Sequence, residues 1–231
     1  MEDTAQDVFI KTALGPIFRA NGLTTKIIVY DHNCDRPDYP MYILKDPKAA
    51  PYVTGSAFHL YLGKVEAMSG VHEAYPHKGL YFTEIYTAGR SAFAGDLEWH
   101  MANVIIGAPN NWAKNVLEWN LASDPDLNPH TPGGCNTCLG AVTISDSVSV
   151  SRNVAYYIVA HASKFVPSGS VRIGSEAPKD LVNVAFRTPG GKFVLIVLNK
   201  ANHTQTFGLG LKGGKAVTAT LNAGAVGTFI W

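Results

Sequence analysis

Four short apolar segments, each ending in polar residues, recur along the first half of the chain. A continuous apolar run of this length is typical of a strand that is buried on both faces of a parallel sheet. The starts of the segments lie roughly 25 to 35 residues apart, which is the spacing of βα units. We therefore predict four parallel strands, within Lys26–His32, Gly55–Tyr61, Gly79–Tyr86 and Asn115–Leu121.

Helical patterns lie before, between and after these segments. We expect helices over residues 5–19, 46–52, 96–106 and 151–166. The first has apolar residues at a period near 3.6, which indicates one buried face. Those residues are Val8, Phe9, Ala13, Ile17 and Phe18.

The pattern changes after Pro167, where short alternating segments are separated by Gly, Pro and Asn turns. These predict an antiparallel β-sandwich over residues 167–231. Four βα units amount to half of a (β/α)₈ barrel. The predicted fold is thus α/β plus β, with a partial barrel over residues 1–166 followed by the sandwich. The sandwich strands are expected at residues 171–174, 181–187, 193–199, 206–211, 216–221 and 226–231.

Charge and apolar composition exclude several classes of protein. Lysine plus arginine number 19 against 18 acidic residues, a net charge of +1, which gives no electrostatic basis for binding nucleic acid or an anionic membrane. No apolar run reaches the roughly 18–20 residues of a membrane-spanning helix. The start Met1–Thr4 is not a secretory signal.

Three cysteines allow two interpretations. Cys135 and Cys138 form a Cys-x-x-Cys pair that fits either a small disulfide or half of a metal site. A zinc site needs about four ligands, but Cys34 is isolated and the eight histidines show no close pair. We favour a disulfide or free thiols, and we expect no metal and no organic cofactor.

Polar side chains collect where the predicted strands end, which in a (β/α)₈ barrel is the end that carries the active site. Glu84 ends an apolar strand, where a carboxylate is either functional or paired in a salt bridge. The chain contains no G-x-S-x-G, no P-loop and no G-x-G-x-x-G after a strand, so serine-hydrolase and nucleotide chemistry lack support. Aromatic rings beside amides and imidazoles suit sugars instead. The other strand-end residues are Asp31, His32, His59, Tyr61, Trp119 and Asn120.

Six motifs in order along the chain resemble glycoside hydrolase family 30, the glucosylceramidase-like group of retaining β-glycosidases. The resemblance covers the C-terminal half of that family, a (β/α)₈ barrel with an attached β-sandwich. The motifs are Tyr30–Pro37, Phe58–Tyr61, Tyr81–Glu84, Leu117–Ala122, His130–Cys135 and His161–Pro167.

The resemblance implies a role for each strand-end residue. Glu84 matches the catalytic nucleophile, and Tyr61 matches an aromatic residue that hydrogen-bonds it. Trp119 and Asn120 match the floor of the sugar subsite, and Asn136 matches an asparagine on the following loop. The resemblance also places Asp31, His32 and His59 near the bound sugar, as substrate-binding residues.

The resemblance also implies a second carboxyl, the acid/base, in an Asn-Glu-Pro motif that this sequence lacks. We therefore expect the chain to be a fragment of a longer, secreted or periplasmic enzyme, to need the N-terminal half of the barrel as its partner, and to be inactive when isolated.

Two positions bear on the substrate. Leu60 stands where animal glucosylceramidases have tryptophan, and Ile85-Tyr86 stands where they have Ala-Cys. His59-Leu60-Tyr61 and the Gly133-Gly134-Cys135-x-x-Cys138 loop look closer to the endo-β-1,6-glucanase branch and so favour a β-glucan substrate, although Ile85 departs from the glutamine of that branch. A glucosylceramidase, a non-catalytic carbohydrate-binding fragment and an unstable remnant without function are the alternatives.

Overall fold

The computed structural model describes residues 1–89, 91–176, 178–211 and 213–231. The chain divides into two compact units, which are described separately. Unit 1 comprises Met1–Ile85 and Ala108–Glu118, and unit 2 comprises Tyr86–Gly107 and Trp119–Trp231. Within the described residues, none of the helices combines the length and the apolar composition needed to span a membrane.

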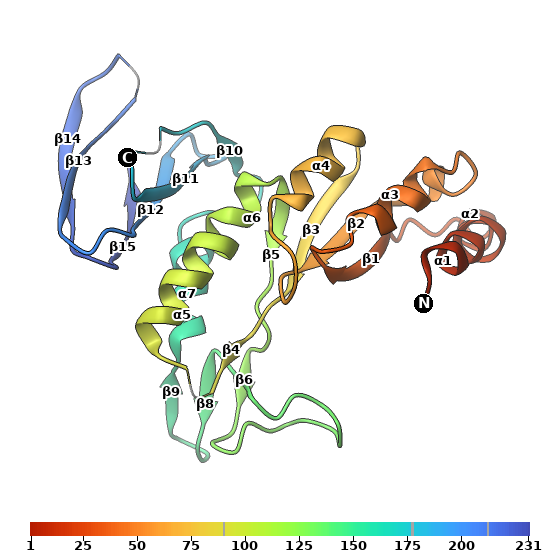
Figure 1. Cartoon of the computed structure of the whole chain (residues 1–231), viewed down its shortest axis with the longest axis horizontal. Coiled ribbons are helices and arrows are strands. Elements are labelled where there is room, and N and C mark those ends of the chain that lie inside the picture. Colours follow the sequence, from red (N-terminus) through yellow and green to blue (C-terminus); the bar gives the residue numbers. More distant parts are fainter. Residues whose placement is uncertain (90, 177, 212) are drawn as a thin grey trace. The chain divides into compact units, whose positions relative to one another are not determined.

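Unit 1 is built on a four-stranded parallel sheet in the order β1-β2-β3-β5, as Figure 1 shows. Sequential strands pair with each other, as is expected for consecutive strands of a (β/α)₈ barrel. The elements of unit 1 are α1 (Asp3–Phe9), the π-helix η1 (Ile10–Leu14), α2 (Gly15–Ala20), β1 (Ile27–Asn33), α3 (Asp38–Lys45), the 3₁₀ helix η2 (Ala50–Tyr52), β2 (Val53–His59), α4 (Ala67–Ala74), β3 (Gly79–Glu84) and β5 (Ala113–Val116).

The four predicted strands are present, although the last differs in its bounds. Strand β2 is buried along nearly its whole length, as its unbroken apolar run predicts, and Phe58 is fully buried. Strand β3 ends at Glu84. Strand β5 covers only Ala113–Val116, so Trp119 follows the strand instead of ending it.

The prediction of a helix over residues 46–52 is correct only for its end, where Ala50–Tyr52 form the 3₁₀ helix η2. Helix α3 ends at Lys45, and Asp46 is already extended, with ψ at 115°. The Asp46 carboxylate accepts hydrogen bonds from the Lys48 amide and from Lys11 Nζ, and these contacts hold a turn in place of a helix. Helix α4 has no counterpart in the prediction.

The predicted buried face of the first helix is also wrong. Asp7 and Ile10 are each 2% exposed, whereas Val8, Phe9 and Ile17 are about half exposed. Asp7 is buried because Lys11 Nζ bridges it, at 2.5 Å, to Asp46 at 2.7 Å. The buried face of this helix therefore follows the ion pair of Asp7 and not the apolar periodicity.

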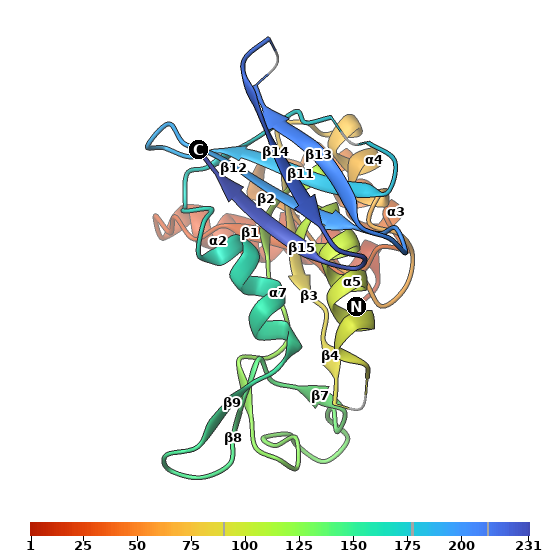
Figure 2. The same cartoon turned by 90° about the vertical axis from the view of Figure 1, so that its left-hand side faces the viewer.

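Unit 2 combines helices, short strands and two antiparallel sheets, seen in Figure 2. Helix α6 (Gly107–Asn110) crosses the boundary between the units. The remaining elements are β4 (Thr87–Ala88), α5 (Phe93–His100), the π-helix η3 (Met101–Ile105), β6 (Ala122–Ser123), β7 (Cys138–Leu139), β8 (Val142–Ile144), β9 (Val150–Arg152), α7 (Val154–Ser163), β10 (Val171–Ile173), β11 (Leu181–Arg187), β12 (Phe193–Asn199), β13 (Gln205–Gly210), β14 (Ala216–Leu221) and β15 (Val226–Ile230).

The six strands predicted after Pro167 are present. Strands β10, β11, β12 and β15 form one antiparallel sheet, and β13 and β14 form a hairpin. Leu181, Val197 and Leu221 are buried between them, with Phe207 and Phe229 packed alongside. This apolar layer is the core of the β-sandwich.

Residues 122–152 contain four short strands that the sequence did not indicate. Strand β7 pairs with β4, and β8 pairs with both β6 and β9. Strands of two or three residues have no usable periodicity. The pairings of these four strands hold the long segment that follows Trp119 in place.

Asn199 at the end of β12 is the polar centre of the sandwich. It is fully buried, and its Nδ2 lies within 3.0 Å of the carbonyl oxygens of His203, Leu221 and Asn222. Its Oδ1 accepts a hydrogen bond from the amide of Ala201. The side chain thus joins β12 to the turn after it and to the end of β14.

We predict that Asn199→Ala destabilises the chain by about 2–4 kcal/mol, because several buried backbone groups lose their hydrogen-bond partner. Urea unfolding of both proteins measures the change. Asn202→Ala, at an exposed asparagine in the adjacent turn, is the control and should change the free energy by less than about 0.5 kcal/mol. Similar losses in both variants would contradict the assignment.

Helix α7 is joined to the sandwich through His161 and Thr228. His161 Nδ1 lies 2.9 Å from Thr228 Oγ1, and the same hydroxyl donates to the His161 carbonyl at 3.3 Å. Burial lowers the pKa of His161. The folded protein therefore binds a proton at this site more weakly than the unfolded chain does.

We predict that this histidine makes the protein less stable in mild acid. The contribution of His161 to the free energy of unfolding should be fully present above its pKa in the unfolded chain, about 6.5. It should be lost as the pH falls towards the lower pKa of His161 in the folded protein. His161→Gln removes the titration, so its unfolding free energy should fall less between pH 7 and pH 5 than that of the unmodified chain. If the unfolding free energies of His161→Gln and of the unmodified chain fall equally with pH, then His161 does not contribute to the acid sensitivity.

Candidate functional site

Glu84 and Tyr61 form a hydrogen-bonded pair at the carboxyl end of the parallel sheet. Tyr61 Oη donates to Glu84 Oε1 at 3.0 Å. The Tyr61 amide donates to the side chain of buried Asn33, at the end of β1, at 3.0 Å. The ends of three neighbouring strands thus position one carboxylate and its donor.

Two β-bulges shape this end of the sheet. Tyr30 pairs with Ala57 and His32 with Phe58, which leaves Asp31 as the extra residue of β1. A second shift leaves Thr83 as the extra residue of β3. A bulge re-aims the side chain of its extra residue, and here Thr83 Oγ1 donates to Asp31 Oδ1 at 2.7 Å.

The first bulge is held in an unusual backbone conformation. Tyr30 and Asp31 have φ values of 76° and 64°, in the left-handed region that bulky residues seldom adopt. The Tyr30 hydroxyl donates to the Asn33 carbonyl, and burial raises the pKa of Tyr30 to about 12. The neutral phenol is a permanent donor that braces the bulge.

The two histidines lie next to this bulge. His59 Nε2 is 3.1 Å from Asp31 Oδ1, the same oxygen that accepts from Thr83. The His32 ring lies 6.1 Å from the His59 ring, edge to face. The structure therefore brings together Asp31, His32 and His59, and separately pairs Tyr61 with Glu84, within unit 1. Thr83 was missed, because alternation along a strand gives no sign of a bulge.

Trp119 and Asn120 belong to unit 2 and border a cavity of about 400 Å³. Trp119 is 49% exposed, and its backbone forms a parallel bridge with Tyr86. The Asn120 carbonyl accepts from the Ala141 amide at 2.8 Å. Asn136 is exposed and is not part of the cavity lining, so its role in sugar binding stays a prediction.

Cys135 and Cys138 form a disulfide, and Cys34 is a buried free thiol. Burial raises the pKa of the Cys34 thiol to about 12, so this thiol is inert at neutral pH. Among the residues that the structure describes, no three histidine, cysteine or acidic side chains converge as metal ligands do.

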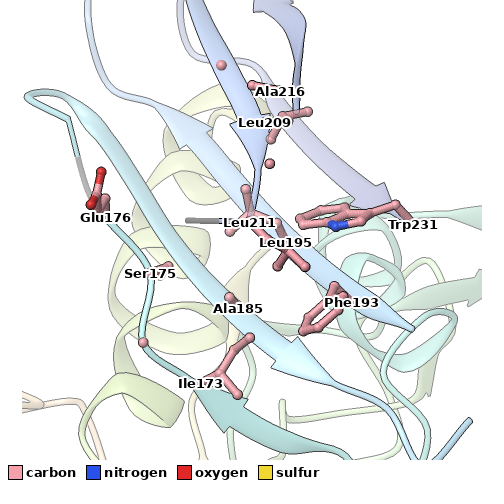
Figure 3. Close-up of a pocket in the computed structure, with 13 residues that line it drawn as sticks. Ile173, Ser175, Glu176, Ala185, Phe193, Leu195, Leu209, Leu211, Ala216 and Trp231 are labelled. Atoms are coloured by element: carbon pink, nitrogen blue, oxygen red, sulfur yellow. The ribbon is translucent and has the colours of Figure 1, made fainter. Parts of the chain in front are cut away.

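A larger cavity, of about 670 Å³, lies in the β-sandwich (Figure 3). Its walls are mainly apolar, with Phe193 stacked on Trp231 and Leu195 alongside. Glu176 is its one carboxylate among the described lining residues. None of the strand-end residues borders it, and its chemistry does not resemble that of the Glu84 site.

The Glu84 site has the groups needed for sugar chemistry. A carboxylate that receives a phenol hydrogen bond is a suitable nucleophile, and the neighbouring imidazoles and carboxylate can bind hydroxyl groups. In unit 2, described by itself, the exposed ring of Trp119 offers a face for the C–H surface of a sugar.

Two family models match the chain. The glycosyl hydrolase family 30 TIM-barrel domain matches residues 2–166, and the family 30 beta sandwich domain matches residues 169–229. The (β/α)₈ barrel portion followed by a β-sandwich is thereby confirmed.

Similar proteins agree with this match. The endo-1,6-beta-D-glucanase neg1 of Aspergillus fumigatus is 31% identical over 96% of this chain and 46% of its own length. The lysosomal acid glucosylceramidase of Mus musculus is 29% identical over 84% of this chain and 40% of its own length. The crystallised endo-beta1,6-glucanase BT3312 is 35% identical, with a TM-score of 0.92 over all of this chain and 54% of that one.

The chain spans about half the length of the curated relatives that it matches. With both domain models matched in order over nearly its whole length, the chain belongs to glycoside hydrolase family 30.

Proposed function

We propose that the chain carries the nucleophile side of a retaining β-glycosidase that cleaves β-1,6-glucan. The observation that carries this proposal is the hydrogen bond from Tyr61 to Glu84 at the carboxyl end of β3. That end of the strands is where barrel enzymes place their catalytic groups.

The reaction is a double displacement. A Glu84 oxygen attacks the anomeric carbon, and the bond to the leaving oxygen breaks as a second carboxyl, about 5–5.5 Å away, gives that oxygen a proton. The same carboxyl then takes a proton from water, which displaces Glu84 and releases the sugar. The second carboxyl is not assigned to a residue of this sequence. Tyr61 Oη holds one Glu84 oxygen and leaves the other for attack.

The substrate class follows from the relatives. Proteins named as endo-1,6-beta-glucanases are among those most similar to this chain, at 29–35% identity, and BT3312 shares the fold over the whole chain. Glucosylceramide is the second candidate, since a glucosylceramidase matches at 29%. Leu60, which stands where animal glucosylceramidases have tryptophan, is buried, and so is Ile85.

We also propose that the protein works in an oxidising compartment, outside the cell or in the periplasm. The Cys135–Cys138 disulfide supports this, because such bonds persist in oxidising surroundings and are rare in the cytosol.

We predict that Glu84 forms a covalent bond with an activated fluoroglucoside. In 2,4-dinitrophenyl 2-deoxy-2-fluoro-β-glucoside the leaving group needs no protonation, so the test does not depend on the acid/base. Mass spectrometry of the intact chain should show addition of one deoxyfluoroglucosyl group, and peptide mapping should locate it on Glu84. Glu84→Gln should remain unlabelled.

The control is Glu73→Gln, at a glutamate of α4 outside the site, which should label like the unmodified chain. Failure of the folded chain to label at millimolar reagent would overturn the nucleophile assignment. Retained binding of β-1,6-linked gluco-oligosaccharides in a calorimetric titration would then favour a non-catalytic carbohydrate-binding role.

A further inference from the structure

The cavity that Trp119 and Asn120 border is also lined by a loop to which the resemblance gives no role. The lining residues of this loop, which we call the wall, are Pro129, His130, Thr131, Gly134 and Cys135. Asn120 Oδ1 is buried and accepts no hydrogen bond from any described residue. Buried polar atoms are normally satisfied, so this oxygen lacks the partner that such an atom usually has.

The chemistry of the lining favours a neutral, hydroxyl-rich ligand. The cavity has an aromatic face in Trp119, an amide in Asn120, a hydroxyl in Thr131 and an imidazole in His130, and no carboxylate or lysine among its described lining residues. Its volume of about 400 Å³ falls within the range of small-molecule sites, about 300–1,000 Å³. These properties suit a sugar and not an anion or a cation.

The segment that leads into this wall is fixed by Asp124. Its Oδ1 accepts hydrogen bonds from the amides of Asp126 and Asn128, at 2.9 and 2.8 Å, and its amide donates to the Asn128 carbonyl at 2.9 Å. These bonds, led by the Asn128 amide, hold the pKa of the Asp124 carboxyl below its usual range, and the nearby His130 adds to the effect. The loop closes on itself immediately before Pro129.

The wall itself is held by a turn and a disulfide. The Gly134 amide donates to the Thr131 carbonyl at 2.8 Å, across a turn in which Gly133 has φ of 81°, a conformation that favours glycine. Cys135 then bonds to Cys138 in β7, which pairs with β4. The loop is thus tied at both ends and its side chains are preorganised.

We propose that residues 129–135 form a second sugar subsite, which binds the glucosyl unit next to the one that lies on Trp119. His130 is the specificity-determining residue, because it is the imidazole among the residues that line this cavity together with Trp119. Asp124 and the disulfide are positioning groups. This inference rests on the proposed function and extends it, since such a subsite selects chains of β-linked glucose over single glucosides.

The experiment compares ligands of different length on the full chain. Binding of methyl β-glucoside, gentiobiose and gentiotriose is followed by the NMR signal of the Trp119 indole in the unmodified chain, His130→Ala and Asp124→Ala. We expect both variants to bind gentiotriose about three- to tenfold more weakly, the effect of one or two lost hydrogen bonds. Their affinity for methyl β-glucoside should change by less than about twofold, since that ligand does not reach the wall.

Two matched controls separate this effect from general damage. His203→Ala removes an exposed histidine from a sandwich turn, and Asp146→Ala removes an aspartate that accepts hydrogen bonds from the Val148 and Ser149 amides in another loop. Both should bind all three ligands as the unmodified chain does. A loss in Asp124→Ala but not in Asp146→Ala identifies positioning of the wall as the cause.

Each contrary outcome has a definite meaning. Equal losses for all three ligands, unchanged binding of gentiotriose, or no binding of any ligand at millimolar concentration would overturn the subsite. The fluoroglucoside carries a single sugar, so its reaction with Glu84 does not need the wall. If Glu84 is labelled but gentiobiose and gentiotriose bind no more tightly than methyl β-glucoside, then only the subsite proposal is overturned. If Glu84 is not labelled, then the proposed function itself is overturned.

Discussion

The hydrogen bonds between β1, β2 and β3 decide where every candidate group of unit 1 lies. Parallel strands end at one edge of a sheet, and the pairing of Asn33 with His59 and of His59 with Glu84 brings three strands to that edge together. An uninterrupted ladder would alternate the side chains between the two faces. The two bulges break this alternation and make Asp31 and Thr83, from strands that do not pair with each other, hydrogen-bond partners.

The wall beside Trp119 is held by local hydrogen bonds and a disulfide and not by strand pairing. Its residues belong to no long strand, so no ladder can hold them, and a chain of this length without local constraints would be mobile. Asp124, the turn closed by Gly134 and the Cys135–Cys138 bond supply those constraints one after another. A sheet positions the Glu84 carboxylate, whereas local hydrogen bonds and a disulfide position the surface beside the Trp119 ring.

Much of the fold could be predicted from apolar patterning, and the failures have identifiable causes. Strand β2 is detectable because burial on both faces requires an unbroken apolar run. The prediction for the first helix failed because Asp7, polar in sequence, is buried with its ion pair to Lys11, and Lys11 also pairs with Asp46, a residue distant in the chain. The two- and three-residue strands from β6 to β9 leave no periodic trace: β6 and β7 pair with strands distant in the chain, and β8 and β9 form a local hairpin.

In the candidate site, too, some residues could be recognised from the local sequence, whereas others depend on contacts that only the fold creates. Glu84 was identifiable, since a carboxylate that ends an apolar strand requires an explanation. Thr83 and His130 lie within two of the motifs, but their positions were not predictable, because a bulge places the threonine and a folded loop places the histidine. Leu60 and Ile85, the positions that bear on the substrate in sequence, are buried. The candidate carboxylate therefore stands at a strand end, where apolar patterning reveals it, whereas the lining of the cavity beside Trp119 stands on a loop, where no periodic pattern can reveal it.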